Sequence, residues 1–301
     1  MDALVTICAQ QKRYKPSPDA TPIALKTAPL SAVARQWRGI IRSRQTVAPA
    51  ADLYAGRAFG LARDTAQRLG YRLYVISAGL GLVAGSTQSP AYGLTVTPNA
   101  PESIQAKVQG AFTSDRWFGE MLAGPRSAGW SEVLSEGHGL VLIALTRPYA
   151  EMVGPSLANL PKHHLGRVKL FGAGLDAVLP KALHASIAPY DDRLDTIFPG
   201  TRSDFAQRAM VHYAEHIAQG AAGSEADDLL NGILAQVDRP IRTVRQSATD
   251  SDLLALIKTR LTPKASASRL LRQLRDYDAI ACEQGRFARL FRVAKAEADA
   301  L

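Results

Sequence analysis

The chain has 301 residues, of which 47% are hydrophobic and 21% are charged, a composition that excludes wholesale disorder and supplies a core for one large or two ordinary domains. No apolar run approaches the roughly 18 residues of a membrane-spanning helix, and the short apolar segment before Lys12 matches neither a secretory nor a transit signal. The net charge of +9 favours a polyanionic partner, and we expect a cytoplasmic protein without a membrane partner.

Strand and helix patterns alternate along the first two thirds of the chain. Apolar runs rich in β-branched residues predict strands at residues 3–8, 72–77, 140–146 and 167–171. Amphipathic patterns predict helices at residues 31–44, 52–69, 117–122 and 149–157. This alternation is typical of an α/β domain with a mixed, largely parallel sheet flanked by helices.

Ligands bind such sheets beyond the carboxyl ends of their strands. Cys8, Ser77, Thr146 and Gly172 each end or follow a predicted strand. We therefore expect functional side chains to gather at that edge of the sheet.

The last third of the chain is mostly helical. Helices are predicted at residues 204–219, 251–261, 266–276 and 286–297. The small polar segment at 220–227 predicts a hinge. We therefore expect an α/β domain over residues 1–220 and a helical module, of the helix-turn-helix or winged-helix type, over residues 221–301.

Positive charge is concentrated at both ends of the chain. Residues 1–50 contain 8 Lys or Arg and 2 Asp or Glu, residues 239–301 contain 13 and 7, and residues 51–238 contain 15 and 18. The residues predicted to form the core face of the 266–276 helix are Leu270, Leu271, Leu274 and Tyr277. The arginines expected to contact DNA phosphates are Arg269, Arg272, Arg275 and Arg286. A helical lid or dimerisation module with a solvated basic face is the alternative.

Four segments occur in a fixed order in the first hundred residues: Cys8-Ala-Gln-Gln-Lys12, Pro49-Ala-Ala-Asp-Leu-Tyr54-Ala-Gly56-Arg-Ala-Phe59, Ser77-Ala-Gly-Leu-Gly-Leu82 and Pro90-Ala-Tyr92. Their order and spacing resemble the family that joins YaaA-type proteins to the catalytic core of archaeosine synthase, including its DpdC-like members. The sequence departs from the family pattern at Ala9, where a serine is usual, and at Leu80, where an aromatic residue or lysine is common.

The resemblance implies nucleobase chemistry. Archaeosine synthase acts on 7-cyano-7-deazaguanine in RNA, and DpdC-like proteins are associated with the nitrile of that base in DNA, alongside other DNA-modification proteins. It would make Cys8 a nucleophile that forms a thioimidate with the nitrile carbon, with Lys12 as its activating cation and Ser77 as a further catalytic group. The alternative for Cys8 is a small buried hydrophobe that ends a core strand.

Further residues are candidates for binding the substrate. Tyr54 and Arg57 suit a base and a phosphate, and the backbone at Gly79 suits an anion or a base edge. The complete set of candidate binding residues is Asp52, Tyr54, Arg57, Gly79, Tyr92, Arg202 and Asp204. Asp52 has the alternative role of a helix N-cap, and Arg202 and Asp204 that of flanks to an ordinary Ser203 cap.

His212-Tyr-Ala-Glu215-His216 matches a short zinc-protease pattern. Five-residue patterns of this kind arise by chance, and we favour a helix face with surface or interdomain histidines over a metal site. No cofactor is expected, because no Walker-type or dinucleotide-binding glycine motif occurs.

Three functions remain open from the sequence. The first is an enzyme that hydrates the nitrile of 7-cyano-7-deazaguanine, free or in DNA. The second is a non-catalytic DNA-binding stress or defence protein of the YaaA type. The third is a DNA glycosylase that uses Asp52 or Asp204.

Overall fold

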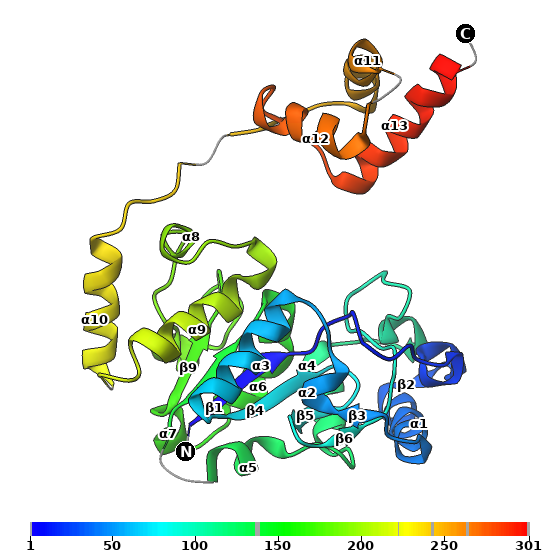
Figure 1. The fold of residues 1–301 in the computed structure, drawn as a ribbon. Helices are drawn as coiled ribbons and strands as arrows, with labels where there is room; N and C mark the ends of the chain where they lie inside the picture. Colours follow the sequence, from blue (N-terminus) through cyan, green and yellow to red (C-terminus); the bar gives the residue numbers. More distant parts are fainter. Residues whose placement is uncertain (1, 136–138, 222, 242–243, 263–264, 300–301) are drawn as a thin grey trace. The chain divides into compact units, whose positions relative to one another are not determined.

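The computed structural model describes residues 2–135, 139–221, 223–241, 244–262 and 265–299 (Figure 1). The chain forms two compact units, Met1–Arg239 (unit 1) and Pro240–Leu301 (unit 2). Unit 1 contains the α/β fold and unit 2 is a helical module, so the predicted fold class is confirmed.

Unit 1 is built on a five-stranded sheet with the strand order β5-β4-β1-β8-β9. The strands are β1 (Ala3–Ile7), β4 (Arg72–Ser77), β5 (Gly81–Ala84), β8 (Val141–Ala144) and β9 (Val168–Phe171). β4, β1, β8 and β9 are parallel, and β5 folds back antiparallel to β4. The central strands are mostly apolar because both faces of a parallel sheet are buried.

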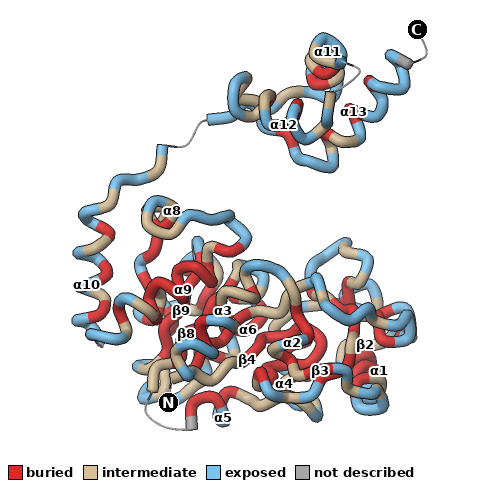
Figure 2. Tube along the Cα trace, viewed as in Figure 1, coloured by how far each residue is buried: buried red, intermediate tan, exposed pale blue. Residues whose placement is uncertain are grey.

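Helices cover both faces of this sheet. The core on one face includes residues of α1 (Leu30–Ser43), α4 (Ser114–Leu122), α5 (Gly129–Ser135) and α6 (Arg147–Ala158). The core on the other face includes residues of α3 (Arg57–Leu69), α9 (Phe205–His216) and α10 (Ser224–Ala235). Alternate residues of β1 enter the two cores, as the pleat requires. Figure 2 shows the buried residues along the strands and the helix sides that face them.

Short elements complete unit 1. The short helices are α2 (Ala50–Leu53), α7 (Lys162–Leu165) and α8 (Leu194–Ile197). The 3₁₀ turns are η1 (Pro18–Ala20), η2 (Pro22–Ala24), η3 (Ile104–Lys107), η4 (Lys181–Ser186) and η5 (Arg202–Asp204). Two strand pairs join distant loops, β2 (Ala28–Pro29) with β7 (Val108–Gln109) and β3 (Ala48–Pro49) with β6 (Gln88–Ser89).

Helix α10 occupies the region where a hinge was expected. It begins at Ser224, and its apolar residues Ala226, Leu230 and Leu234 are buried in the core beside α9. The ammonium group of Lys169 on β9 lies 2.5 Å from a carboxylate oxygen of Asp227. These contacts place α10 in unit 1, so the expected boundary at residue 220 does not match the two units.

Unit 2 contains α11 (Asp250–Arg260), α12 (Ala267–Asp276), α13 (Gln284–Asp299) and a parallel pair of β10 (Gln246–Ser247) with β11 (Ile280–Ala281). Leu270, Leu271 and Leu274 are buried in its core, as predicted. Tyr277 is 85% exposed, contrary to prediction, because α12 ends at Asp276 and Tyr277 is its C-cap.

None of the helices within the described ranges is long and apolar enough to cross a membrane.

Candidate functional site

Cys8 and Tyr149 meet at the carboxyl edge of the sheet. Cys8 follows β1, and its backbone N–H donates to the carbonyl of Ile76 at 2.9 Å. Tyr149 lies in the first turn of α6, directly after β8. Because β8 is the parallel neighbour of β1, the two side chains converge, and the Cys8 Sγ lies 3.0 Å from the Tyr149 hydroxyl.

The Cys8 side chain opens onto a cavity of about 200 Å³, called here the Cys8 pocket. Its wall consists of three parts, the segment after β1, the loop that precedes η3 and the first turn of α6. The lining residues are Cys8, Ala9, Gln10, Lys12, Leu94, Thr95, Thr97, Ala100, Glu102 and Tyr149. Lys12 and Glu102 therefore bring opposite charges to one small cavity beside a thiol.

Tyr54 reaches this region because the helix expected over residues 52–69 is interrupted. Helix α2 ends at Leu53 and α3 begins at Arg57, with Gly56 between them at a φ of 103° that favours glycine. Tyr54 pairs with Lys12 in an isolated antiparallel bridge. The interruption turns the Tyr54 ring inward, where it is only 1% exposed.

The Lys12 ammonium group lies over buried aromatic rings. Its Nζ is 4.7 Å from the centre of the Tyr92 ring and 5.9 Å from that of Tyr54. Such contacts hold a cation by attraction to the face of the ring. They position the Lys12 charge in the wall of the Cys8 pocket.

Behind the pocket, Ser77, Tyr92 and Tyr54 form a chain of hydrogen-bonded hydroxyl groups. The Ser77 Oγ accepts the backbone N–H groups of Gly79 at 3.1 Å and Leu80 at 2.9 Å. The Tyr92 hydroxyl lies 2.5 Å from the Ser77 Oγ and 2.8 Å from the Tyr54 hydroxyl.

The backbone donors fix the direction of this chain. A serine hydroxyl has two acceptor positions and one proton, and the two N–H groups occupy both acceptor positions of Ser77. Ser77 therefore donates to Tyr92, and Tyr92 donates to Tyr54. The proton of the Tyr54 hydroxyl is left for an acceptor beyond the chain.

Burial raises the pKa of the Tyr54, Tyr92 and Tyr149 hydroxyls above the ordinary tyrosine value, and negative charge on Cys8 raises each of them further. All of them are therefore protonated at neutral pH. Tyr149 can donate a hydrogen bond to a Cys8 thiolate, which stabilises the charged form of the thiol.

Gly79 contributes to the site through its packing against Tyr92. It does not line the Cys8 pocket, and a Cβ at this position would lie 2.5 Å from a ring atom of Tyr92. Its carbonyl accepts the indole N–H of Trp37 at 2.7 Å. Gly79 thus allows the close approach of Tyr92 that the hydroxyl chain requires.

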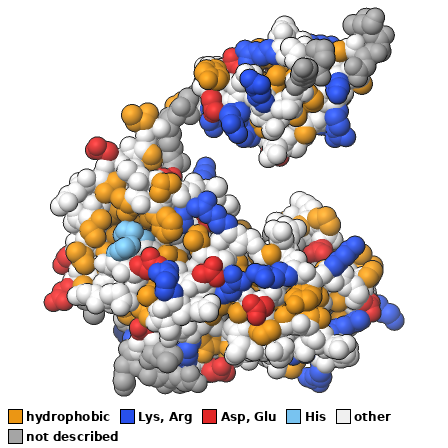
Figure 3. Space-filling model, in the orientation of Figure 1, with side chains coloured by type: hydrophobic (Ala, Val, Ile, Leu, Met, Phe, Trp, Pro, Cys, Tyr) orange, Lys and Arg blue, Asp and Glu red, His pale blue; other side chains and the backbone are white. Residues whose placement is uncertain are grey.

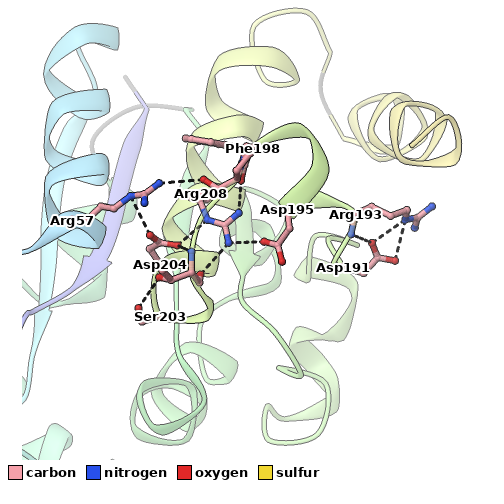
Figure 4. Close-up of polar contacts among 10 residues, drawn as sticks. Arg57, Asp191, Arg193, Asp195, Phe198, Ser203, Asp204 and Arg208 are labelled. Atoms are coloured by element: carbon pink, nitrogen blue, oxygen red, sulfur yellow. Dashed lines mark hydrogen bonds and ion pairs between the residues drawn. The ribbon is translucent and has the colours of Figure 1, made fainter. Parts of the chain in front are cut away.

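Arg57 and Asp204 lie in a separate cluster centred on buried Arg208 (Figure 4). An Asp204 carboxylate oxygen lies 2.8 Å from the Arg208 Nε and 2.8 Å from the Thr201 backbone nitrogen, and its other oxygen lies 3.2 Å from the Arg57 Nε. Burial alone would raise the pKa of Asp204, but the hydrogen bonds from Arg208 and Thr201 outweigh burial and lower it. Asp204 is therefore an ionised anchor for Arg208.

This cluster adjoins a second cavity of about 370 Å³, which Arg57, Ser203 and Asp204 line together with Ala9. Ala9 lines both cavities, so the second cavity neighbours the Cys8 pocket. Arg202 is exposed and lines neither.

Asp52 lies away from the Cys8 pocket. It is exposed in α2 and lines a different cavity with Arg63 and Tyr71. The N-cap of α2 is Pro49, so the alternative role of Asp52 as an N-cap is wrong.

His212 and His216 lie on α9, as the pattern predicts. His212 is buried, and its Nδ1 lies 2.7 Å from the Tyr190 hydroxyl, while His216 is exposed. Burial lowers the pKa of His212. Within the described residues, no group of three or more His, Cys, Asp or Glu side chains could hold a metal ion.

The four predicted DNA-binding arginines have different surroundings in unit 2. Arg275 donates to the Cys282 carbonyl at 2.6 Å, and Arg286 lies 2.6 Å from Asp250. Both guanidinium groups therefore join elements within unit 2. Arg269 and Arg272 are exposed.

Comparison of the chain with models of known families, with curated proteins and with solved structures found no match. The site must therefore be interpreted from its own chemistry. It combines a thiol, a cation, a carboxylate and protonated tyrosine hydroxyls around one pocket. Tyr149, Glu102 and Thr95 were not predicted from the sequence, because they come from segments without a recognisable motif.

Proposed function

We propose that unit 1 is a cysteine-dependent enzyme that hydrates the nitrile of 7-cyano-7-deazaguanine to an amide. The observation that carries this proposal is the Cys8 thiol, 3.0 Å from the hydroxyl of half-buried Tyr149, in the wall of a pocket that Lys12 and Glu102 also line. A thiolate stabilised by a hydrogen-bond donor and a nearby cation is a nucleophile suited to an electrophilic carbon.

The reaction proceeds in two stages. The Cys8 thiolate attacks the nitrile carbon, a C–S bond forms, and the nitrile nitrogen takes up a proton to give a thioimidate. Water then adds to the same carbon, the C–S bond breaks, and the amide leaves with the thiolate restored. The net change is the addition of one water to the nitrile, and no oxidant or reductant is consumed.

The side chains of the pocket divide these tasks. Tyr149 and Lys12 stabilise the thiolate, and Lys12 supplies the proton that the nitrile nitrogen takes up. Glu102 is the only carboxylate among the residues that line the Cys8 pocket, and it accepts the proton of the attacking water. The directed chain of Ser77, Tyr92 and Tyr54 presents one further donor behind the thiol.

The size of the pocket favours a single base as substrate. About 200 Å³ is smaller than the roughly 300–1,000 Å³ of sites for drug-sized ligands, so it suits one fused-ring base. A base in duplex DNA would have to leave the stack to enter it. The order of the Cys8, Tyr54, Ser77 and Tyr92 segments, which resembles the 7-deazaguanine family, supports the same substrate class.

Nucleoside mass spectrometry tests the proposal. The purified chain is incubated with free 7-cyano-7-deazaguanine and with duplex DNA that contains it. The DNA is digested to nucleosides, and the masses of the products are measured. We expect a gain of one water per modified base, and we expect Cys8→Ala to abolish it. Cys282→Ala removes the only other cysteine of the chain and should leave the reaction intact.

Other outcomes point elsewhere. Release of the base from DNA would support the glycosylase, although Asp52 and Asp204 both lie outside the Cys8 pocket. Unchanged substrate together with salt-sensitive DNA retention would support the non-catalytic binding protein. Equal hydration by Cys8→Ala would contradict the thioimidate.

A further inference from the structure

The acidic side chains that the structure describes in unit 2 are all engaged within the unit. Some pair with basic residues: Asp250 with Arg286 and Arg289, Asp276 with Arg245, Asp278 with Arg260, and Glu297 with Lys258. The others cap helices: Asp252 accepts from the backbone of Thr249, and Glu283 from those of Gly285 and Arg286. The acids of unit 2 thereby compensate the charges of Arg245, Lys258, Arg260, Arg286 and Arg289.

Arg269 and Arg272 on α12 stand apart from these pairs. Both are exposed, and neither side chain has a hydrogen-bond or ion-pair partner among the described residues. They are three positions apart, so they share one side of the helix. Leu270, Leu271 and Leu274 on the opposite side are buried in the core of unit 2. The uncompensated charge of α12 is therefore held on a fixed outward surface.

We propose that this surface of α12, defined by Arg269 and Arg272, binds the phosphates of double-stranded DNA. The planar guanidinium group donates paired hydrogen bonds that match a phosphate, and an α-helix fits the major groove of B-DNA. On the visible face of unit 2, Lys and Arg side chains predominate over Asp and Glu (Figure 3). Arg275 and Arg286 instead form contacts between elements within unit 2.

An anionic membrane is the competing polyanion. Amphipathic helices that bind membranes insert an apolar face into the lipid. The apolar face of α12 is occupied by the core of unit 2, which favours DNA. The proposal does not depend on the chemistry at Cys8.

Fluorescence anisotropy of the full chain with a labelled DNA duplex of about 20 base pairs, between about 0.05 and 0.3 M salt, tests this inference. The double variant R269Q/R272Q removes both phosphate contacts, and glutamine maintains the helix. We expect its affinity to fall at least about tenfold at the lowest salt, and the slope of log K against log salt to decrease by about 2.

The matched control is K258Q/R289Q, which removes the same charge from exposed side chains that already pair with acids. We expect it to bind DNA nearly as well as the unmodified chain. Equal loss of binding in both double variants would overturn the assignment, because it would indicate a general charge effect. Unchanged binding by R269Q/R272Q, or binding to phosphatidylserine vesicles without binding to the duplex, would overturn it as well.

Discussion

At the scale of single residues, the environment of Cys8 separates it from Cys282. Cys8 lies in the wall of a pocket beside the Tyr149 hydroxyl. Cys282 is buried in the core of unit 2, where burial raises the pKa of its thiol. A thiolate-dependent reaction is therefore supported at Cys8 and opposed at Cys282.

Tyr149→Phe should slow the alkylation of Cys8 by iodoacetamide about tenfold at neutral pH, because a hydrogen bond to a charged group is worth about 1.5 kcal/mol. The ring remains, so packing should change little. The rate of iodoacetamide alkylation of Cys8, measured against pH in the Cys282→Ala background, gives this value directly. An unchanged alkylation profile would show that Tyr149 does not stabilise the thiolate.

Asp204 should contribute to stability in a pH-dependent way. Its pKa in the folded chain is below the ordinary value of 3.8, so its contribution is complete above that value and is lost as the pH falls through the folded pKa. Asp204→Asn removes a carboxylate that pairs with the buried Arg208 guanidinium group. We expect this substitution to reduce the free energy of unfolding by about 3 kcal/mol at neutral pH.

Urea unfolding of the Asp204→Asn variant checks this value. The difference from the unmodified chain should narrow toward the acid limit of folding, because the unmodified carboxylate is then protonated too. Loss of stability that is independent of pH would indicate that the charge of Asp204 is not the cause.

At the scale of elements, the sequence predicts the parallel strands well and the broken helix poorly. β1, β4, β8 and β9 are short and mostly apolar, a pattern typical of strands that are buried on both faces. The apolar spacing from 52 to 69 satisfies helical periodicity, yet the chain leaves the helix at Tyr54. The bridge to Lys12 that stabilises this interruption is a tertiary contact, which periodicity does not contain.

The candidate site divides in the same way. Cys8, Lys12, Tyr54, Ser77, Gly79 and Tyr92 come together at the carboxyl edge of β1 and β4. Their grouping follows from the pairing of β1 with β4, and the sequence predicts the carboxyl ends of the strands as the place where functional side chains gather. Glu102 and Tyr149 come from a loop and a helix start that carry no motif, and only the folded chain brings them to Cys8. Helix α10 was missed because its first turn is small and polar.

Gly56→Ala should destabilise unit 1 by about 2 kcal/mol, because the backbone there has a φ of 103° that side chains disfavour. There is no steric obstacle within 4 Å of the added methyl group, so the loss would come from the backbone alone. Gly60→Ala, inside α3 and equally unobstructed, is the matched control and should stabilise by about 1 kcal/mol. Chemical denaturation measures the free energy of unfolding of both variants. A Gly56→Ala chain as stable as the unmodified chain would contradict a requirement for glycine at the positive φ between α2 and α3.

At the scale of the whole molecule, the thiol pocket and the unpaired arginines of α12 lie in different units. Unit 1 contains the thiol pocket, and unit 2 carries arginines that its own acids leave uncompensated. Under the two proposals, unit 1 modifies a base and unit 2 binds the phosphates of the same polymer.

The most direct test of the central claim is detection of the covalent bond at Cys8. The chain is quenched with acid during turnover of 7-cyano-7-deazaguanine, digested and analysed by peptide mass spectrometry. Glu102→Gln should slow the attack of water and allow the thioimidate to accumulate. We predict one added base on the peptide that contains Cys8, more abundant in Glu102→Gln than in the unmodified chain. Turnover with no adduct at Cys8 in either protein, or with the adduct at Cys282, would contradict the account.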